Sequence, residues 1–290
     1  MELSVVLPIY NEKEVVGSFY HALRSSLDRI TTDYEIIFVD DGSIDGTVPE
    51  LLSLASSDPH LTIIELTRNF GNAMAIATGL EFASGHWVVT MDSDFEDQPE
   101  HIEALYKKAI EGYDVVYAVR ESKHKSFAKD IGSRLFYAVL SRIADFPMPS
   151  HSGNFGIMNQ DVVRALRKMT ERTRYFHGLR SWVGFKQVGL ALPRGKRLAG
   201  EPKQSFPRLI RQALDAVFAF STAPLKLLTF LGVVAFFSAL ALALLVILMR
   251  FNRPEITMAW APTLIAVVFL GGVQLIGLGV LGEYLCRVYN

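Results

Sequence analysis

The sequence predicts an α/β domain built on a doubly wound, mostly parallel sheet, followed by a two-helix hairpin. Short apolar runs alternate with helical patterns through the first part of the chain, and the strand-like runs end in polar clusters. Two long uncharged runs lie beyond residue 225. Strands that alternate with helices are typical of parallel sheets, because each connection crosses one face of the sheet.

The elements of this domain follow in order along the chain. The expected strands are short, apolar and partly β-branched, and they cover residues 3–9, 35–39, 61–66, 87–91 and 115–119. The expected helices cover residues 14–30, 47–55, 71–83 and 99–111. The last of these carries Pro99 in its first turn, where proline is well tolerated. We expect one catalytic domain over residues 1–205.

Composition excludes some classes of function. The 290 residues carry a formal net charge of −1, which gives no indication of nucleic acid as a partner. The single cysteine, Cys286, excludes a disulfide within the chain and a cysteine-based metal site. Half of the residues are hydrophobic, which is high for a soluble protein, and the excess is concentrated near the C-terminus.

The C-terminal region, residues 225–290, predicts two membrane spans. Residues 227–249 and 261–282 contain no charged side chain, and each is long enough for a hydrocarbon core of about 30 Å. Two buried core helices are the alternative. Residues 206–224 have a helical apolar pattern, which suits either a helix along the interface or one packed on the soluble domain. The basic residues near the spans favour a multi-pass protein of the inner, cytoplasmic membrane with its catalytic domain on the cytoplasmic side.

Polar clusters should gather at one edge of the sheet. They occupy residues 8–12, 40–43, 67–71 and 92–94, each directly after an expected strand. In sheets of this kind ligands bind at the carboxyl ends of the strands. So many carboxylates require a cation, a donor-rich ligand, or both.

Asp92 and Asp94 are the candidate metal ligands. The chain lacks both the glycine-rich dinucleotide fingerprint and the P-loop, so a metal bridging carboxylates and a diphosphate is the natural substitute. Two residues apart in extended chain, these side chains point the same way, and oxygen ligands suit Mg²⁺ or Mn²⁺. A surface loop is the alternative for this pair. Likewise Asp40 and Asp41 could simply begin a turn, and Tyr10 could serve packing.

The motifs together resemble family 2 glycosyltransferases of the GT-A fold. They are VVLPIYNE at 5–12, VDDGSIDGT at 39–47, RNFGNAMAIATGL at 68–80 and MDSDFEDQPE at 91–100. Three later features make the resemblance more specific: RYFHGLRSWVGFKQ at 174–187, the two predicted spans, and GEYLCR at 282–287. With these, the chain is similar to polyprenyl-phosphate glycosyltransferases of the bactoprenol glucosyltransferase and dolichol-phosphate mannose synthase type. The resemblance covers nearly the whole chain.

The resemblance implies roles for the matching positions. Asp92 and Asp94 would hold the metal and the diphosphate, and Glu96 adds a third carboxylate where the family commonly has glutamine. The basic residues that would face phosphates are Arg134, Arg197 and Lys203. The residues that would line the nucleotide are Pro8, Tyr10, Glu12, Val39, Asp40, Asp41, Arg68 and Ser93.

Two departures from the family pattern affect the acceptor side. The family often has Gly-Asp-Phe-Arg after the fifth strand, whereas this chain has Gly153-Asn154-Phe155-Gly156. The family also often has a tyrosine where this chain has Gln204. Three further basic residues have two interpretations. They could contribute to the site or form a solvated or lipid-facing surface, and they are Arg174, Arg180 and Lys186.

The reaction implied by the resemblance is the inverting transfer of one sugar, glucose being expected, from a UDP-linked donor to undecaprenyl or another polyprenyl phosphate. The acceptor phosphate is already anionic at neutral pH, so a strong general base is unnecessary. Homo-oligomers are common in the family, and small residues in the second span would allow helices to associate. Two alternatives remain: a processive polysaccharide synthase of the same fold, whose Gln-x-x-Arg-Trp motif is absent here, and a catalytically silent membrane-tethered scaffold.

Overall fold

The computed structural model describes residues 1–120, 152–169, 176–193, 195 and 260–289, with single residues between 228 and 248. These residues fall into two units, one holding the described residues up to 195 and the other holding helix α10 (Trp260–Tyr289). Arg134, Arg197 and Lys203 lie outside the described residues. The segment at 206–224 and most of the first predicted span lie outside them as well.

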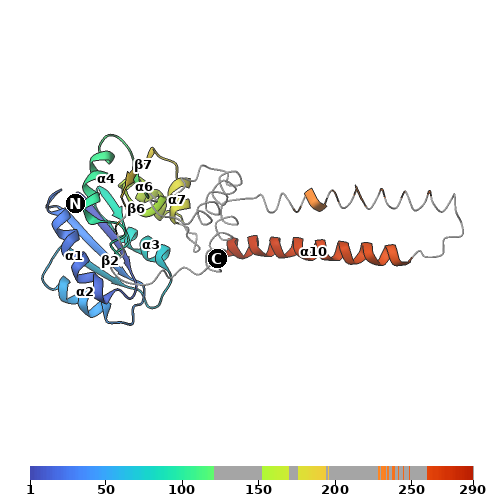
Figure 1. Cartoon of the computed structure of the whole chain (residues 1–290), viewed down its shortest axis with the longest axis horizontal. Coiled ribbons are helices and arrows are strands. Elements are labelled where there is room, and N and C mark those ends of the chain that lie inside the picture. The colour runs from blue at the N-terminus through green and yellow to red at the C-terminus, as the bar shows by residue number, and fades with distance from the viewer. Residues whose placement is uncertain are drawn as a thin grey trace. The chain divides into compact units, whose positions relative to one another are not determined.

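The first unit is built on one mixed sheet (Figure 1). Its described strands run in the order β3-β2-β1-β4-β6-β5-β7. Their bounds are β1 Leu3–Ile9, β2 Tyr34–Asp40, β3 Leu61–Glu65, β4 Trp87–Thr90, β5 Val115–Arg120, β6 Ser152–Asn159 and β7 Gln187–Leu192. The five predicted strands are confirmed, with ends that differ by a residue at most. Strands β6 and β7 are additional.

Strand β6 is the exception to the parallel arrangement. Parallel pairing joins β1 to β2 and β4, β2 to β3, and β5 to β7. In contrast, β6 runs antiparallel to both β4 and β5. The expectation of a mostly parallel sheet therefore holds, with one antiparallel strand inserted beside β4.

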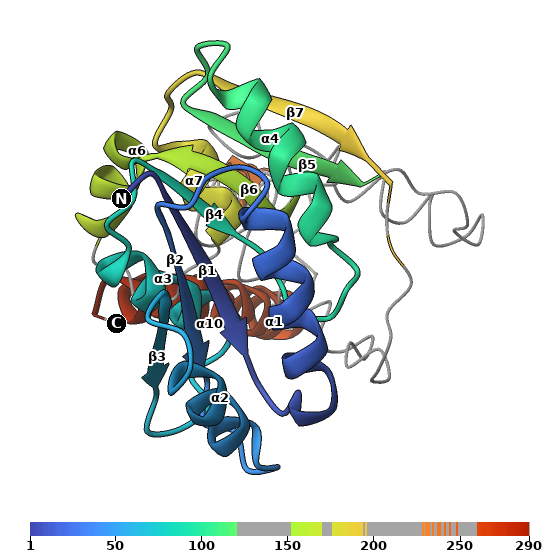
Figure 2. The same ribbon diagram turned by 90° about the vertical axis from the view of Figure 1, so that its left-hand side faces the viewer.

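Helices cover both faces of this sheet (Figure 2). Helices α1 and α4 lie on one face, and α3 and α6 on the other. The bounds of the helices are α1 Lys13–Leu27, α2 Thr47–Ala55, α3 Asn72–Phe82, α4 Ile102–Ala109, α6 Gln160–Arg167 and α7 Phe176–Trp182. A 3₁₀ turn at Pro99–His101 precedes α4, so the helix predicted from residue 99 begins with a tighter turn.

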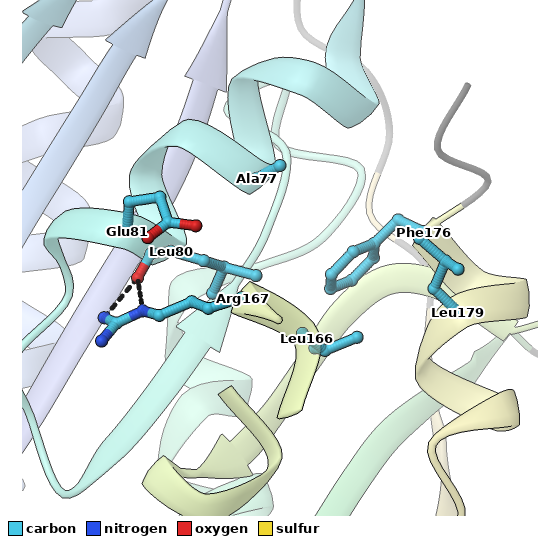
Figure 3. Close-up of a pocket in the computed structure, with 7 residues that line it drawn as sticks. All are labelled: Ala77, Leu80, Glu81, Leu166, Arg167, Phe176 and Leu179. Carbon is cyan, nitrogen blue, oxygen red and sulfur yellow. Dashed lines mark hydrogen bonds between the residues drawn. The ribbon is translucent and has the colours of Figure 1, made fainter. Parts of the chain in front are cut away.

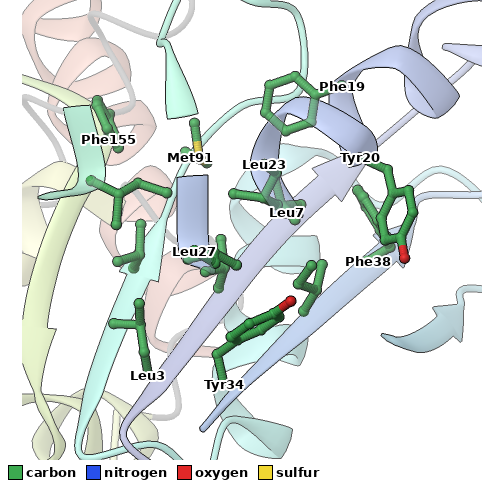
Figure 4. Packing of buried hydrophobic residues seen from close by; sticks show 14 of the residues in the cluster. Leu3, Leu7, Phe19, Tyr20, Leu23, Leu27, Tyr34, Phe38, Met91 and Phe155 are labelled. Carbon is green, nitrogen blue, oxygen red and sulfur yellow. The ribbon is translucent and has the colours of Figure 1, made fainter. Parts of the chain in front are cut away.

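A hydrophobic core lies between the sheet and helices α1 and α4, and Figure 4 shows the part that involves α1. Leu3 and Leu7 of β1 point to the same face because strand side chains alternate. They meet Phe19, Leu23 and Leu27, which recur at helical spacing on one side of α1. All five side chains are fully buried. This packing fixes β1 and α1, and with them the loop between them, which carries part of the predicted site.

The second unit is described by α10, which spans 30 residues. Several of its apolar side chains are exposed, among them Val267, Phe269, Leu275 and Leu278. Within the described residues, no helix has both the length and the apolar character required to cross a membrane. The two predicted spans therefore stay a prediction.

Candidate functional site

Hydrogen bonds join the loops that follow β1 and β2. The backbone amide of Asn11 donates to Ser43 Oγ at 2.8 Å, and the backbone amide of Ile44 donates to Asn11 Oδ1 at 2.9 Å. The Glu12 amide donates to Thr47 Oγ1 at 3.1 Å. The two predicted polar clusters therefore lie together, because small polar side chains of one loop bind the backbone of the other.

Ser93 and Glu12 join the end of β4 to the end of β1. The Ser93 hydroxyl donates to Glu12 Oε2, and Ser93 is almost fully buried. Both residues are predicted to bind the nucleotide, and the structure brings them into direct contact. The contact makes Ser93 a support for the Glu12 carboxylate as well as a candidate ligand residue.

Asp41 fastens the loop between β3 and α3. Its Oδ1 accepts from the Phe70 amide at 2.7 Å, and its Oδ2 accepts from the Gly71 amide at 2.8 Å. Burial raises the pKa of the Asp41 carboxyl, although the two amide hydrogen bonds oppose the shift. Both oxygens of this predicted nucleotide-binding residue are thus already engaged with the backbone.

Asp40 differs from its neighbour. It is fully buried at the end of β2, and its Oδ2 accepts from the Ser43 amide at 2.9 Å. Its Oδ1 is buried and accepts no hydrogen bond within the described part of the chain. Buried acceptor atoms normally have a hydrogen-bond donor. Of the two aspartates, Asp40 is therefore the one whose carboxylate can still accept a hydrogen bond from a ligand.

The remaining predicted nucleotide residues differ in exposure. Pro8 and Val39 are neighbours in the β1–β2 pair and both are buried, and their contact with the nucleotide stays a prediction. Tyr10 is half-buried just beyond β1. Arg68 is exposed, and its guanidinium lies 4.2 Å from the centre of the Phe70 ring. Asp41 accepts a hydrogen bond from the backbone amide of the same Phe70, so it also positions the aromatic ring that Arg68 contacts.

Asp92 lies in a ring of hydrogen bonds with two asparagines. Its Oδ1 accepts from Asn72 Nδ2 at 3.1 Å and from Asn154 Nδ2 at 3.0 Å. Asn154 Nδ2 also donates to Asn72 Oδ1 at 3.1 Å. Asn72 begins α3 and Asn154 lies in β6, so three separate elements meet at this carboxylate. Asn72 has no role that the sequence predicts, and Asn154 stands out in the sequence only as a departure from the family pattern.

Asp94 belongs to a tight loop after β4. Its Oδ1 accepts from the Glu96 amide at 3.0 Å, and Phe95 between them has a φ of +62°. The Gly195 amide donates to the Glu96 carbonyl at 3.0 Å, so the segment after β7 touches this loop. Among the described residues, no group of three or more Asp, Glu, His or Cys side chains is arranged to hold a metal ion. The predicted ligands Asp92, Asp94 and Glu96 therefore do not form a three-carboxylate site by themselves.

Arg180 is not the surface residue that one alternative expects. It is fully buried in α7, where its Nη1 donates to the Gly153 carbonyl at 3.3 Å. Its guanidinium carbon lies 4.8 Å from the centre of the Tyr117 ring. Lys186, in contrast, is exposed, as the surface interpretation expects.

A small apolar cavity lies away from this polar edge, between α3, α6 and α7 (Figure 3). Arg167 borders it and donates from Nε to the Leu80 carbonyl at 2.8 Å. The cavity volume of about 10 Å³ matches roughly one water molecule. This cavity is too small for a sugar nucleotide, and the candidate site rests on the contacts of the polar edge.

Comparison with known proteins agrees with this geometry. The sequence profile of the family described as "Glycosyl transferase family 2" matches residues 4–167, which include β1 to β6 and every carboxylate discussed above. The chain belongs to this family.

Full-length relatives narrow the comparison. An uncharacterised glycosyltransferase of Synechocystis sp. is 39% identical over 291 residues, which cover 100% of this chain and 92% of the relative. The bactoprenol glucosyl transferase of Shigella phage SfV is 36% identical and covers 100% and 94%. A prophage bactoprenol glucosyl transferase homolog of Escherichia coli K12 is 34% identical and covers 100% and 95%.

Solved structures support the fold. The mannosyltransferase PcManGT of Pyrobaculum calidifontis, determined with GDP-Man and Mn²⁺, superposes with a TM-score of 0.53. It is 17% identical, over 99% of this chain and 84% of that chain. Glucosyl-3-phosphoglycerate synthase of Mycobacterium tuberculosis, with Mn²⁺, UDP and phosphoglyceric acid, gives a TM-score of 0.51 at 19% identity, over 75% and 78% of the two chains. The predicted GT-A type of fold is confirmed by these similarities and by the family.

Proposed function

We propose that this glycosyltransferase moves a single glucose from UDP-glucose to a polyprenyl phosphate at a membrane surface, with inversion at the anomeric carbon. The observation that carries the proposal is full-length similarity, at 34% and 36% identity, to proteins named bactoprenol glucosyl transferase. The polar edge supports it, because Asp92, Ser93 and Asp94 lie at the carboxyl end of β4 beside the ends of β1 and β2. Ligands bind at this edge in α/β sheets.

The carboxylates fit a divalent cation of the Mg²⁺ or Mn²⁺ type. Asp92 and Asp94 offer oxygen donors only, which these ions prefer. Mg²⁺ is commonly held by one or two carboxylates together with substrate phosphates. A pair of aspartates without a third carboxylate therefore suits a site that the donor diphosphate completes. When bound, the ion would neutralise charge that develops on the departing diphosphate.

The proposed reaction exchanges one bond to the sugar for another. An oxygen of the acceptor phosphate forms a bond to the anomeric carbon, and the bond from that carbon to the UDP oxygen breaks. UDP leaves with the electron pair. The acceptor oxygen is anionic at neutral pH, so none of this chain's residues has to remove a proton. Asp92 and Asp94 would hold the diphosphate of the sugar donor through the divalent cation. Arg68 is exposed in the loop that Asp41 anchors, where it can contact an anionic group of the nucleotide.

The basic residues Arg134, Arg197 and Lys203 are proposed to bind the phosphates of donor or acceptor. Gly195, two positions before Arg197 in the chain, contacts the Asp94–Glu96 loop through its amide, which supports a role for this segment near the site. The uncharged run at 261–282 and the exposed apolar side chains of α10 support the proposal that the C-terminal unit associates with lipid. In this proposal the catalytic unit faces the cytoplasm and the chain assembles as a homo-oligomer.

A transfer assay tests the function directly. The full-length protein in detergent is incubated with undecaprenyl phosphate, Mn²⁺ or Mg²⁺ and radiolabelled UDP-glucose, and the lipid phase is extracted. We expect label in the lipid, and loss of that label with EDTA or with Asp94→Asn. Asp33→Asn is the matched control, because Asp33 is an exposed aspartate at the opposite edge of the sheet, just before β2. It should transfer at the parent rate.

Two other outcomes would change the conclusion. Label that appears only with another sugar nucleotide would replace the donor and keep the reaction type. A folded protein that transfers no sugar from a broad panel of donors would overturn the transferase proposal and favour a silent scaffold.

A further inference from the structure

We infer that Asn72 and Asn154 are positioning residues that orient the Asp92 carboxylate for its metal and diphosphate. This inference rests on the proposed function, because it concerns the same site. It adds two amide side chains to the machinery, one of them at the start of α3 and the other in the antiparallel strand β6.

The geometry assigns each oxygen of Asp92 a different task. Both asparagine amides donate to Oδ1, at 3.1 Å from Asn72 and 3.0 Å from Asn154. Within the described part of the chain, Oδ2 accepts no hydrogen bond. Two donors on one oxygen fix the plane of the carboxylate, so Oδ2 is the atom presented in a defined direction. A carboxylate that ligates a metal is commonly held in this way by a hydrogen bond on its other side.

The ring of hydrogen bonds also fixes the orientation of both amides. Asn154 uses Nδ2 toward Asp92 and toward Asn72 Oδ1, which lies 3.1 Å away. Turning either amide over would place an amide oxygen against a carboxylate oxygen. The arrangement therefore tolerates one orientation only, and it couples the start of α3 to β6 through Asp92. Thr90 of β4 adds a further contact, because its hydroxyl donates to the backbone carbonyl of Asn154 at 2.6 Å.

An acid at position 154 would not reproduce this arrangement. Replacing Asn154 by aspartate would bring a second carboxylate close to Asp92 Oδ1, where the Asn154 amide now lies at 3.0 Å, and leave no proton between them. Two carboxylates at this separation repel each other, so an aspartate would not hold Asp92 in the orientation that the asparagine gives it. Asn154 donates where an aspartate would repel, and it cannot accept a proton from an acceptor substrate.

The test measures Mn²⁺ binding and sugar transfer on the same preparations. Full-length parent, Asn72→Ala and Asn154→Ala proteins in detergent are titrated with Mn²⁺ in the presence of UDP, and free Mn²⁺ is followed by electron paramagnetic resonance. We expect each variant to bind Mn²⁺ about 10-fold to 100-fold more weakly, with a matching loss of kcat. The double variant should lose less than the product of the two single effects, because both amides act on one oxygen.

Asn159→Ala is the matched control. Asn159 also lies in β6, but it caps α6 through the Val162 amide and bonds to Asp114, away from Asp92. This change should lower the thermal stability and leave the Mn²⁺ affinity at the parent value. It separates loss of a metal-positioning contact from general damage to β6.

The Mn²⁺ affinity is a readout that a purely structural role would not affect, because a folded variant whose metal site is intact binds the ion at the parent affinity. Parent-like Mn²⁺ affinity in both alanine variants would overturn the inference. A parent chain that binds Mn²⁺ but transfers no sugar would refute the proposed function instead, and the Mn²⁺ affinities would still decide the role of the two asparagines.

Discussion

A buried carboxylate far from the candidate site gives the sharpest test of the fold. Asp58 lies in the connection between α2 and β3, and its side chain is fully buried. It accepts from the Tyr20 hydroxyl at 2.5 Å and from the His60 amide at 3.0 Å, and Arg24 Nη1 lies 3.7 Å away. Burial alone would raise the pKa of Asp58, but these hydrogen bonds and the arginine lower it to about 2. The ionised carboxylate therefore ties α1 to the start of β3.

The magnitude follows from the change in pKa. A pKa lowered from 3.8 to about 2 corresponds to about 2 kcal/mol of unfolding free energy at neutral pH. Because the folded-state pKa lies below the unfolded-state value, this contribution is complete above about pH 5 and is lost as the pH falls toward 2. Roughly half of it should remain at pH 3. Asp58→Asn should therefore be about 2 kcal/mol less stable than the parent at pH 7, and the difference should shrink to about half at pH 3.

Urea unfolding followed by tryptophan fluorescence measures this difference. The full-length parent and Asp58→Asn proteins are compared in detergent at several pH values between 7 and 3. Asp33→Asn, at an exposed aspartate, should show no such pH-dependent difference. A parent-minus-variant difference that stays constant from pH 7 to pH 3 would refute the reasoning, because the carboxylate would then not be ionised and stabilised as its contacts indicate.

Two glycines give further predictions about the site. Gly42 has a φ of +74°, and a Cβ there would lie 2.6 Å from the carbonyl carbon of Arg68, so Gly42→Ala should cost about 1–3 kcal/mol and weaken UDP-glucose binding. Urea unfolding and isothermal titration calorimetry check this, and parent values in both would contradict it. A Cβ at Gly195 would lie against the Phe95 carbonyl oxygen, closer than real Cβ atoms come, so Gly195→Ala should lift its segment from the Asp94–Glu96 loop. We expect on the order of a tenfold loss of kcat in the lipid transfer assay with little change in unfolding free energy, and an unchanged kcat would show that the contact is dispensable.

The strands that the sequence predicts are those made mainly of apolar residues, which indicate a buried position in the sheet. Strand β1 is apolar throughout and lies between β2 and β4, covered by helices on both faces. Strand β6 is different, because its sequence SGNFGIMN contains two glycines and two asparagines, which have low strand propensity. Its pairing with β4 and β5 keeps it in the sheet. A strand stabilised by its neighbours in this way leaves little signal in its own sequence.

The same distinction applies to the candidate site. The gathering of carboxylates follows from the rule that parallel strands end at one edge, so Glu12, Asp41 and Asp92 could be placed together in advance. The partners of Asp92 could not. Asn72 and Asn154 are 82 residues apart, and their contact depends on the antiparallel strand that the pattern does not reveal. Arg180 was equally hidden, since a basic residue on a short helix normally indicates a surface.

The way in which the edge carboxylates are held bears on what they can bind. Asp41 accepts from two backbone amides, and Asp92 accepts from two asparagine amides. Asp45 accepts from the amides of Lys13 and Thr47 and from the Thr47 hydroxyl. Among the described residues, the hydrogen-bond donors to these three acids are neutral groups, which fix a carboxylate without cancelling its charge. An edge of this kind repels a bare diphosphate and attracts a divalent cation, so the hydrogen bonds that order the loops also maintain the charge that the proposed donor complex requires.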